Sequence, residues 1–317
     1  KRTLLKHLTG GAMKLNTLNK LIKKTRRWHK KTGFAVFQRA AAHLEAKKKA
    51  TIFSVIDSLN VQPEPVAPVP PAQSRLIWIC WFQGLDHAPE LVKRCIESIK
   101  KNTPDAKTVI LTDDNIADYL TLPDFIIAKY QAGLINKALY SDIVRCSLLY
   151  QYGGVWIDAT VFLTRPLPES FYEHSFSSLR FDDAGQESTI SQGYWTTYLF
   201  AARPGNTLVK FVRDNLYRYW QLNDQSIEYF FTDYCFLYAR EKVPAFHDMM
   251  NRQPVTGNHR FLIRQFINAA PTQTALATLR QDPVGIYKLS HKENYRLTDN
   301  GEPALYSMIL DGRFTLS

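Results

Sequence analysis

Three charged residues within seventeen positions are of the types that bind a phosphorylated sugar. Asp142 and Arg145 are three residues apart in a stretch with helical periodicity, so they share one helix face. Asp158 follows the short apolar run 155–157 and stands at the carboxyl end of an expected strand. A strand-end carboxylate can hold a divalent cation, a guanidinium can bond phosphate oxygens, and a helix carboxylate can accept bonds from sugar hydroxyls. Together these groups suit a nucleotide sugar, whose leaving diphosphate develops negative charge that a cation offsets.

Each of these residues also has an ordinary structural interpretation. Asp142 and Arg145 could form a surface ion pair, and surface pairs contribute little to stability. Asp158 could be only a turn residue at the end of its strand. The order and spacing of the surrounding run decide between the two interpretations.

Strands and helices alternate around these residues. A helix over 135–152 ends at Gly153 and Gly154, which are suited to a left-handed stop before the strand 155–157. Other strands are predicted over 75–82, 107–111 and 199–202, and helices over 90–101, 115–120 and 124–132. This alternation predicts an α/β fold, whose ligands bind at the carboxyl ends of the strands.

The run that contains the three charged residues matches a known pattern. Residues 141–160 read SDIVRCSLLYQYGGVWIDAT, and they strongly resemble the capsular polysaccharide synthesis family. That family belongs to the wider group of Asp-x-Asp sugar transferases that includes fungal mannosyltransferases and clostridial glucosylating toxins. Residues 77–84 (IWICWFQG) and 201–206 (AARPGN) support the resemblance, which covers about 75–295. It implies a GT-A fold, a Rossmann-like α/β domain with a mixed, mostly parallel sheet and flanking helices.

The resemblance also assigns roles to residues of this chain. It implies a nucleoside-diphosphate sugar donor, usually with Mn²⁺ or Mg²⁺. The implied donor-site residues are Trp81 stacked on the base, Asp142 and Arg145 on the sugar, Trp156 beside the nucleotide, and Asp158 as the first carboxylate of Asp-x-Asp. Thr160 departs from the wider group, which has a second carboxylate there, although the capsular branch often reads Asp-Ala-Thr. Three alternatives follow: a metal held mainly by Asp158, diphosphate and water, weak metal binding, or a cation-independent scheme.

Candidates outside the central run come from two later segments. In several GT-A transferases a late His ligates the metal and a nearby Lys contacts phosphate. By that resemblance, His291 is a second candidate metal ligand and Lys292 a candidate donor-binding residue after the strand 286–290, with a solvated turn as the alternative. Asp233 could contact the acceptor, or act as a base if the reaction inverts configuration. Alternatively, Thr232 or Asp233 caps the start of a helix.

The basic character of the chain is concentrated at its beginning. The first fifty residues hold fifteen Lys or Arg and one acid, net +14, whereas the remainder carries net −3. We expect residues 1–60 to form a basic amphipathic helical region, 61–74 with its five prolines a linker, and 75–317 the GT-A domain. Residues 1–50 can lie on an anionic membrane surface, or form a hairpin with a solvated basic face. Binding to nucleic acid through these residues is the third alternative, although it is not expected because aromatic residues are sparse there.

The remaining features limit the compartment and the reaction. The four cysteines form no close pair and lie in apolar runs, which favours buried free thiols and a reducing compartment. No apolar run reaches 18 residues, so no membrane-spanning helix is expected. Walker, G-x-G-x-x-G, H-E-x-x-H and G-x-S-x-G motifs are absent, which disfavours kinases, dehydrogenases, zinc proteases and serine hydrolases.

The sequence therefore predicts a cytoplasmic hexosyltransferase, peripheral on the inner face of the cell membrane. It would use a UDP-sugar, with a GDP-sugar less favoured, and extend a lipid-linked capsular or cell-surface polysaccharide. The resemblance favours retention of configuration. The alternative is a non-catalytic glycan- or nucleotide-binding protein on the same fold.

Overall fold

The computed structural model describes residues 2–66, 75–182 and 189–316, with the backbone alone for 2–14. The chain falls into two compact units, each assembled from segments distant in the sequence. Unit 1 comprises Lys1–Glu64, Leu122–Ile143 and Phe211–Pro244, and unit 2 comprises Pro65–Thr121, Val144–Lys210 and Ala245–Ser317. The predicted domain boundaries at 60 and 74 stay predictions, and most of the predicted linker, 67–74, lies outside the described residues.

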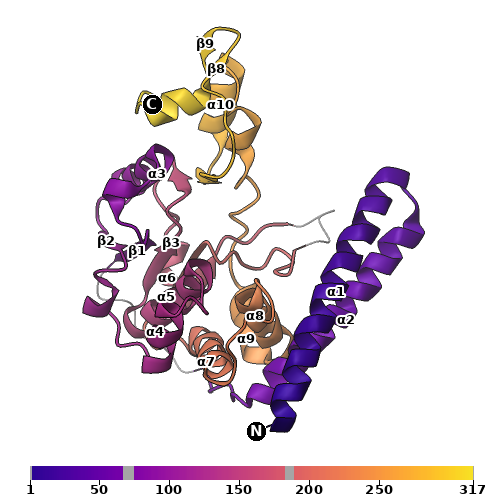
Figure 1. The fold of residues 1–317 in the computed structure, drawn as a ribbon. Coiled ribbons are helices and arrows are strands. Elements are labelled where there is room, and N and C mark those ends of the chain that lie inside the picture. The colour runs from indigo at the N-terminus through magenta and orange to yellow at the C-terminus, as the bar shows by residue number, and fades with distance from the viewer. Residues whose placement is uncertain (1, 67–74, 183–188, 317) are drawn as a thin grey trace. The chain divides into compact units, whose positions relative to one another are not determined.

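Unit 1 is helical, and its most prominent feature is an N-terminal hairpin (Figure 1). Helices α1 (Arg2–Thr32) and α2 (Ala35–Leu59) meet at Gly33, whose φ of +71° suits glycine. The buried face of α1 includes Leu15, Leu18 and Ile22, at the helical spacing predicted from the sequence. The other helices of the unit are α4 (Asp124–Gln131), α8 (Phe231–Lys242), the first part of α5 (Lys137–Tyr152) and most of α7 (Thr207–Leu222).

Unit 2 is built around a five-stranded sheet. Its strands are β1 (Leu76–Cys80), β2 (Lys107–Leu111), β3 (Gly154–Ile157), β5 (Phe176–Ser178) and β6 (Leu199–Ala202), in the order β2-β1-β3-β6-β5. β1 pairs in parallel with both β2 and β3, whereas β6 pairs antiparallel with β3 and β5. Only β6 therefore runs against the other four strands. This mixed, mostly parallel sheet with flanking helices confirms the predicted α/β architecture.

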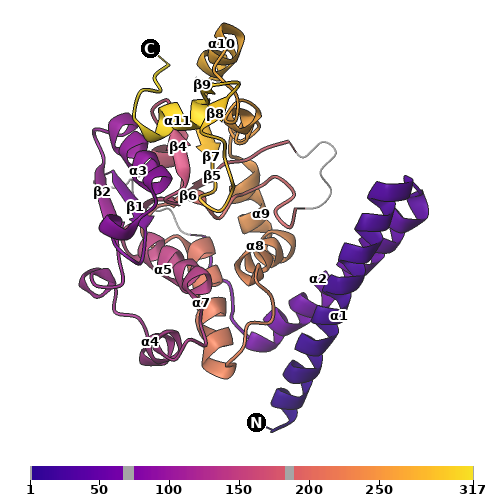
Figure 2. The same cartoon turned by 45° about the horizontal axis from the view of Figure 1, so that its top comes forward.

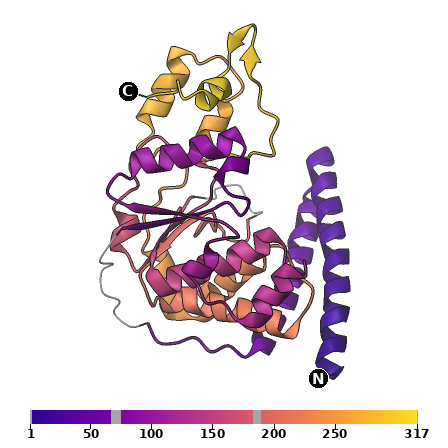
Figure 3. The same cartoon turned by 60° about the vertical axis from the view of Figure 1, so that its left-hand side comes forward.

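Helix α3 (Glu90–Asn102) lies along one side of the sheet (Figure 3). Its residues Val92, Ile96 and Ile99 join the core beneath the strands. Leu91 and Cys95 face a second core, formed with the C-terminal third of unit 2. Burial on two sides fixes α3 between the sheet and the late part of the chain.

A second, smaller sheet joins that late part to the middle of the chain. In it β4 (Val161–Leu163) pairs antiparallel with β7 (Ile286–Lys288) (Figure 2). The register places Val161 opposite Lys288. The other elements of unit 2 are α6 (Ser170–Glu173), α9 (Pro244–Asn251), α10 (Gln273–Gln281), α11 (Leu305–Leu310), the hairpin β8 (Thr298–Asp299) and β9 (Glu302–Pro303), and 3₁₀ turns at Leu85–His87, Ile116–Asp118 and Leu262–Gln265.

The cysteines agree with the expectation of thiols outside disulfides, and three of the four are buried. Cys95, Cys146 and Cys235 are buried and Cys80 is half-buried. Within the described part of the chain, none of the helices is long and apolar enough to cross a bilayer.

Candidate functional site

A glycine pair directs the chain from helix α5 into strand β3. Gly153 and Gly154 have φ of +69° and +99°, which confirms the predicted left-handed stop. A Cβ on Gly154 would lie 2.7 Å from the carbonyl oxygen of Leu76 in β1, and one on Gly153 would lie 2.6 Å from Cδ of Pro204. The indole N–H of Trp78 donates to the Gly153 carbonyl at 2.9 Å. The turn is therefore held tightly against β1, which fixes where β3 begins and ends.

The carboxylate of Asp158, just beyond the end of β3, lies at the centre of a polar cluster. Its Oδ1 accepts a hydrogen bond from Trp156 Nε1 at 3.0 Å and lies 3.8 Å from Nη2 of Arg145. Its Oδ2 accepts from Nζ of Lys288 at 3.1 Å, and the same ammonium donates to Oγ1 of Thr160 at 2.5 Å. The Asp158 side chain is 28% exposed, so a ligand can still reach this cluster.

Besides its approach to Asp158, Arg145 is held by two further contacts within unit 2. Its Nη1 donates to the main-chain carbonyl of Thr197, and its guanidinium lies 5.0 Å from the ring centre of Trp156. Only 7% of the residue is exposed. The interpretation of Arg145 as part of a surface ion pair is therefore wrong, because the guanidinium is buried beside Asp158.

The electrostatics of the cluster keep Asp158 ionised. Burial acts to raise the pKa of this carboxyl, but the charges of Lys288 and Arg145 and the hydrogen bonds from Trp156 and Lys288 lower it below its ordinary value. The cationic side chains of Arg145 and Lys288 both lie beside the Asp158 carboxylate. These two cations favour an anionic ligand at the cluster.

A second group of predicted residues combines Trp81, which follows β1, with His291 and Lys292, which come after β7. The ring of His291 contacts that of Trp81 edge-on, with centres 5.2 Å apart. The indole N–H of Trp81 is buried and has no hydrogen-bond partner among the described residues. Burial, and then the charges of Lys292 and Lys288, lower the pKa of His291, so its imidazole is neutral at pH 7. Lys292 is exposed, and its donor-binding role stays a prediction.

The remaining predicted residues, Asp142 and Asp233, belong to unit 1. Oγ1 of Thr232 donates to Oδ2 of Asp142 at 2.9 Å and so ties α8 to the first part of α5. Helix α8 begins at Phe231, and its N-cap residue Phe230 makes no side-chain cap bond. The prediction that Thr232 or Asp233 caps this helix is therefore wrong, because both lie inside its first turn. The roles of Asp142 at the sugar and Asp233 at the acceptor stay predictions.

The predicted metal site at Asp158 and His291 has few ligands to offer a divalent cation. In the segments that the structure describes, no group of three or more His, Cys, Asp or Glu residues is placed to hold a metal. Mg²⁺ requires near-octahedral oxygen coordination, usually from one or two carboxylates and several waters. Here the single carboxylate already bonds an indole N–H and an ammonium, and Thr160 is neutral. The arrangement fits a side-chain cation better than a divalent metal, and dependence on Mn²⁺ or Mg²⁺ stays a prediction.

Lys288 is the site residue that sequence reasoning missed. It lies in the strand predicted over 286–290, whereas the residues predicted to bind the metal and the donor were the two that follow that strand. An ammonium group in an otherwise apolar strand was the available signal. Its partners, Asp158 and Thr160, are about 130 positions away, and only the pairing of β4 with β7 brings them together.

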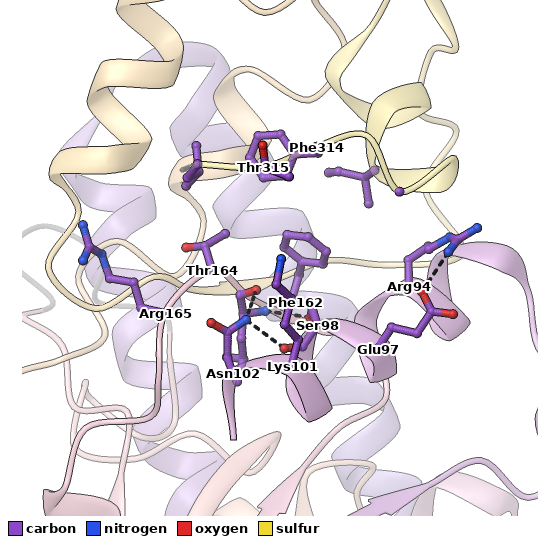
Figure 4. Close-up of a pocket in the computed structure, with 14 residues that line it drawn as sticks. Arg94, Glu97, Ser98, Lys101, Asn102, Phe162, Thr164, Arg165, Phe314 and Thr315 are labelled. Atoms are coloured by element: carbon purple, nitrogen blue, oxygen red, sulfur yellow. Dashed lines mark hydrogen bonds and ion pairs between the residues drawn. The ribbon is translucent and has the colours of Figure 1, made fainter. Parts of the chain in front are cut away.

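A separate cavity of about 420 Å³ lies between α3, β4 and the C-terminal segment (Figure 4). Lys101, Asn102 and Phe162 line it, and Asn102 donates to the carbonyls of Ser98 and Leu163. None of its lining residues belongs to the predicted donor site. This cavity is therefore distinct from the predicted donor site.

Comparisons with known proteins point to sugar-transfer chemistry. A family model described as capsular polysaccharide synthesis protein matches residues 26–309. The chain is 26% identical over 176 residues to glycosyltransferase afumC of Aspergillus fumigatus and 31% identical over 124 residues to O-glycosyltransferase braB of Annulohypoxylon truncatum. These matches cover 48% and 33% of this chain, but only 42% and 29% of the two relatives. Among solved structures, a chain described as PaToxG glycosyltransferase matches with a TM-score of 0.42 and 16% identity, over 65% of this chain and 81% of that one.

Proposed function

Because the chain belongs to the capsular polysaccharide synthesis protein family, we propose that it is a glycosyltransferase that moves a hexosyl unit from a nucleotide sugar to a growing glycan. The observation that carries this proposal is the convergence of Arg145, Trp156 and Asp158 at the end of β3. All three were expected at a donor site from the sequence. A UDP-sugar is the favoured donor and a cell-surface polysaccharide the favoured acceptor.

The charges of the cluster support a donor that carries a diphosphate. When the bond between the sugar C1 and the phosphate oxygen breaks, the diphosphate gains one negative charge. Fixed cationic groups that face this charge lower the barrier, because they need little reorganisation during the reaction. Arg145 and Lys288 are two such groups, each held by contacts to the protein. Retention of configuration is the favoured outcome, and the anomeric configuration of the product, read by NMR, tests it.

The N-terminal hairpin supports a membrane-bound setting for the acceptor. Three large apolar side chains near its turn are exposed: Trp28 by 43%, Phe34 by 63% and Val36 by 64%. Basic residues Arg26, Arg27, Lys30, Lys31 and Arg39 lie in the same stretch. Apolar side chains flanked by positive charge are typical of segments that dip into an anionic lipid surface. We propose that residues 1–50 hold the enzyme at the cytoplasmic membrane face, where it meets a lipid-linked glycan.

A panel of nucleotide sugars tests the donor. Melting temperatures of the full chain are measured with UDP-glucose, UDP-galactose and GDP-mannose, since a ligand at about a hundred times its Kd stabilises the folded state by about 2.7 kcal/mol. We expect stabilisation by a UDP-sugar, followed by its turnover with a glycan acceptor, and loss of both in Arg145→Ala. Arg75→Ala is the matched control, because it removes a half-exposed arginine that lies well before Arg145 in the sequence.

Two outcomes would contradict the proposed function. Stabilisation by a nucleotide sugar without hydrolysis or transfer would favour the alternative, a non-catalytic nucleotide- or glycan-binding protein. The absence of any stabilisation or turnover across the panel would refute a nucleotide-sugar donor altogether.

Liposome flotation tests the membrane proposal. We expect the chain to float with vesicles that contain anionic lipid and to remain unbound with zwitterionic vesicles. The double variant Trp28→Ser/Phe34→Ser should lose flotation, whereas Leu297→Ser, which removes a leucine that is 56% exposed, should keep it. Equal flotation of all three proteins would rule out the hairpin turn as the membrane contact.

A further inference from the structure

The ammonium group of Lys288 lies between the side chains of Asp158 and Thr160, beside the carboxylate that the sequence predicts to be a metal ligand. Its Nζ lies 3.1 Å from Oδ2 of Asp158 and 2.5 Å from Oγ1 of Thr160. These are the two side chains at the positions of an Asp-x-Asp element. Thr160 offers a hydroxyl where a second carboxylate is expected, and that hydroxyl bonds this ammonium.

The protein fixes Lys288 through its main chain as well as its side chain. The pairing of β4 with β7 places Lys288 opposite Val161, one residue after Thr160. The N–H of Lys288 donates to the Arg260 carbonyl at 2.8 Å, and its carbonyl accepts from Nε of Arg264 at 2.8 Å. Its side chain is only 20% exposed, and its Nζ lies 5.2 Å from the ring centre of Tyr198. Lys288 is therefore a positioned group and not a flexible surface lysine.

The neutral hydroxyl of Thr160 and the ammonium of Lys288 affect metal binding at the site in the same direction. A cluster of one carboxylate with two cations binds a divalent metal poorly, because the cations repel it and compete for its ligand oxygens. The same cluster binds a diphosphate well, because ammonium and guanidinium groups make strong charge-assisted hydrogen bonds with phosphate oxygens. Thr160 and Lys288 together therefore favour a built-in cation over a bound metal at this site.

We propose that Lys288, together with Arg145, contacts the leaving diphosphate and that transfer needs no divalent metal. This inference rests on the proposed donor. In the transfer step the bond between the sugar C1 and the phosphate oxygen breaks, and its electron pair stays on the diphosphate. The oxygen of the acceptor hydroxyl bonds to C1, and its proton passes to the diphosphate or to water. Lys288 and Arg145 face the charge that the diphosphate gains.

The first test uses the unaltered full chain. We expect turnover of the preferred nucleotide sugar to continue after metal removal and in the presence of EDTA, with less than about a twofold increase when Mn²⁺ is added. Calorimetric titration should detect binding of the nucleoside diphosphate, but no binding of Mn²⁺ to the protein alone. Turnover that stops in EDTA and returns with Mn²⁺ would overturn the inference and leave the proposed function standing. The absence of binding and turnover with every nucleotide sugar would overturn both.

Variants supply a second, independent test. Lys288→Ala should lower kcat by about 10²–10³-fold, the range seen when one fixed donor is removed from a charge-stabilising site. Lys100→Ala, which removes an exposed lysine of α3, should leave kcat unchanged. The double variant Thr160→Asp/Lys288→Ala restores two carboxylates without the ammonium, so it should bind Mn²⁺ in calorimetry and become dependent on it for turnover. Wild-type rates in Lys288→Ala with a native melting curve would overturn the inference.

Discussion

Replacing Gly154 with alanine tests whether the close contact between the glycine turn and β1 fixes the site. The residue has φ of +99°, and an added Cβ would lie 2.7 Å from the Leu76 carbonyl oxygen and 2.9 Å from the Leu76 Cβ. Backbone strain at such a φ costs about 1–3 kcal/mol for a residue other than glycine. Overpacking against backbone atoms that cannot turn away adds about 1–3 kcal/mol.

Gly301 is a suitable control, because its φ of +89° is similar and nothing lies within 4 Å of its added Cβ. Gly301→Ala should therefore carry the strain alone, and the difference between the two variants, about 1–3 kcal/mol, measures the contact. Urea unfolding followed by tryptophan fluorescence reports on the sheet, since Trp78 and Trp156 are 2% and 1% exposed. Equal destabilisation in the two variants would refute the reasoning, and so would a stable Gly154→Ala protein with full activity.

Two further predictions concern the N-terminal hairpin and the buried thiols. Glu228→Ala should destabilise unit 1 by about 3–5 kcal/mol, because it leaves the nearly buried Lys48 without the carboxylate that lies 2.7 Å away. Glu45→Ala removes one partner of a more exposed ion pair and should cost less than about 1 kcal/mol. Hydrogen exchange of α2 compares the two variants, and equal effects would contradict this prediction. Cys95 should resist alkylation at pH 8 until urea unfolds the chain. Burial raises the pKa of its thiol to about 12, and the charge of Lys288 offsets this only in part. The reactive thiolate is therefore scarce at pH 8. Half-buried Cys80 should react first in mass-spectrometric mapping, and modification of both thiols at one rate would show that Cys95 is accessible.

The local elements of unit 2 were predictable because their signals lie close together in the sequence. The expected helix 135–152 and strand 107–111 match α5 (Lys137–Tyr152) and β2 (Lys107–Leu111) within two residues. Apolar periodicity and paired glycines supply these signals without any tertiary information. The same local reading correctly placed Asp158 at the end of β3.

Contacts between distant segments could not be predicted in the same way. The ion pair between Lys288 and Asp158 depends on the register of β4 with β7, and no local pattern specifies which late strand pairs with which early one. The supposed cap at Thr232 failed for a related reason. Its hydroxyl bonds Asp142, ninety residues earlier, and so is not a local helix cap.

The wide sequence separation in this small sheet has a consequence for synthesis in the cell. A chain leaving the ribosome exposes Asp158 long before Lys288 has been translated, so the carboxylate first stands without its ammonium partner. Because distant pairings close late in folding, the chain must be translated as far as Lys288 and beyond before β4 finds β7. A polypeptide that ended before β7 would keep the whole central run but would lack the ammonium that bonds Asp158 and Thr160.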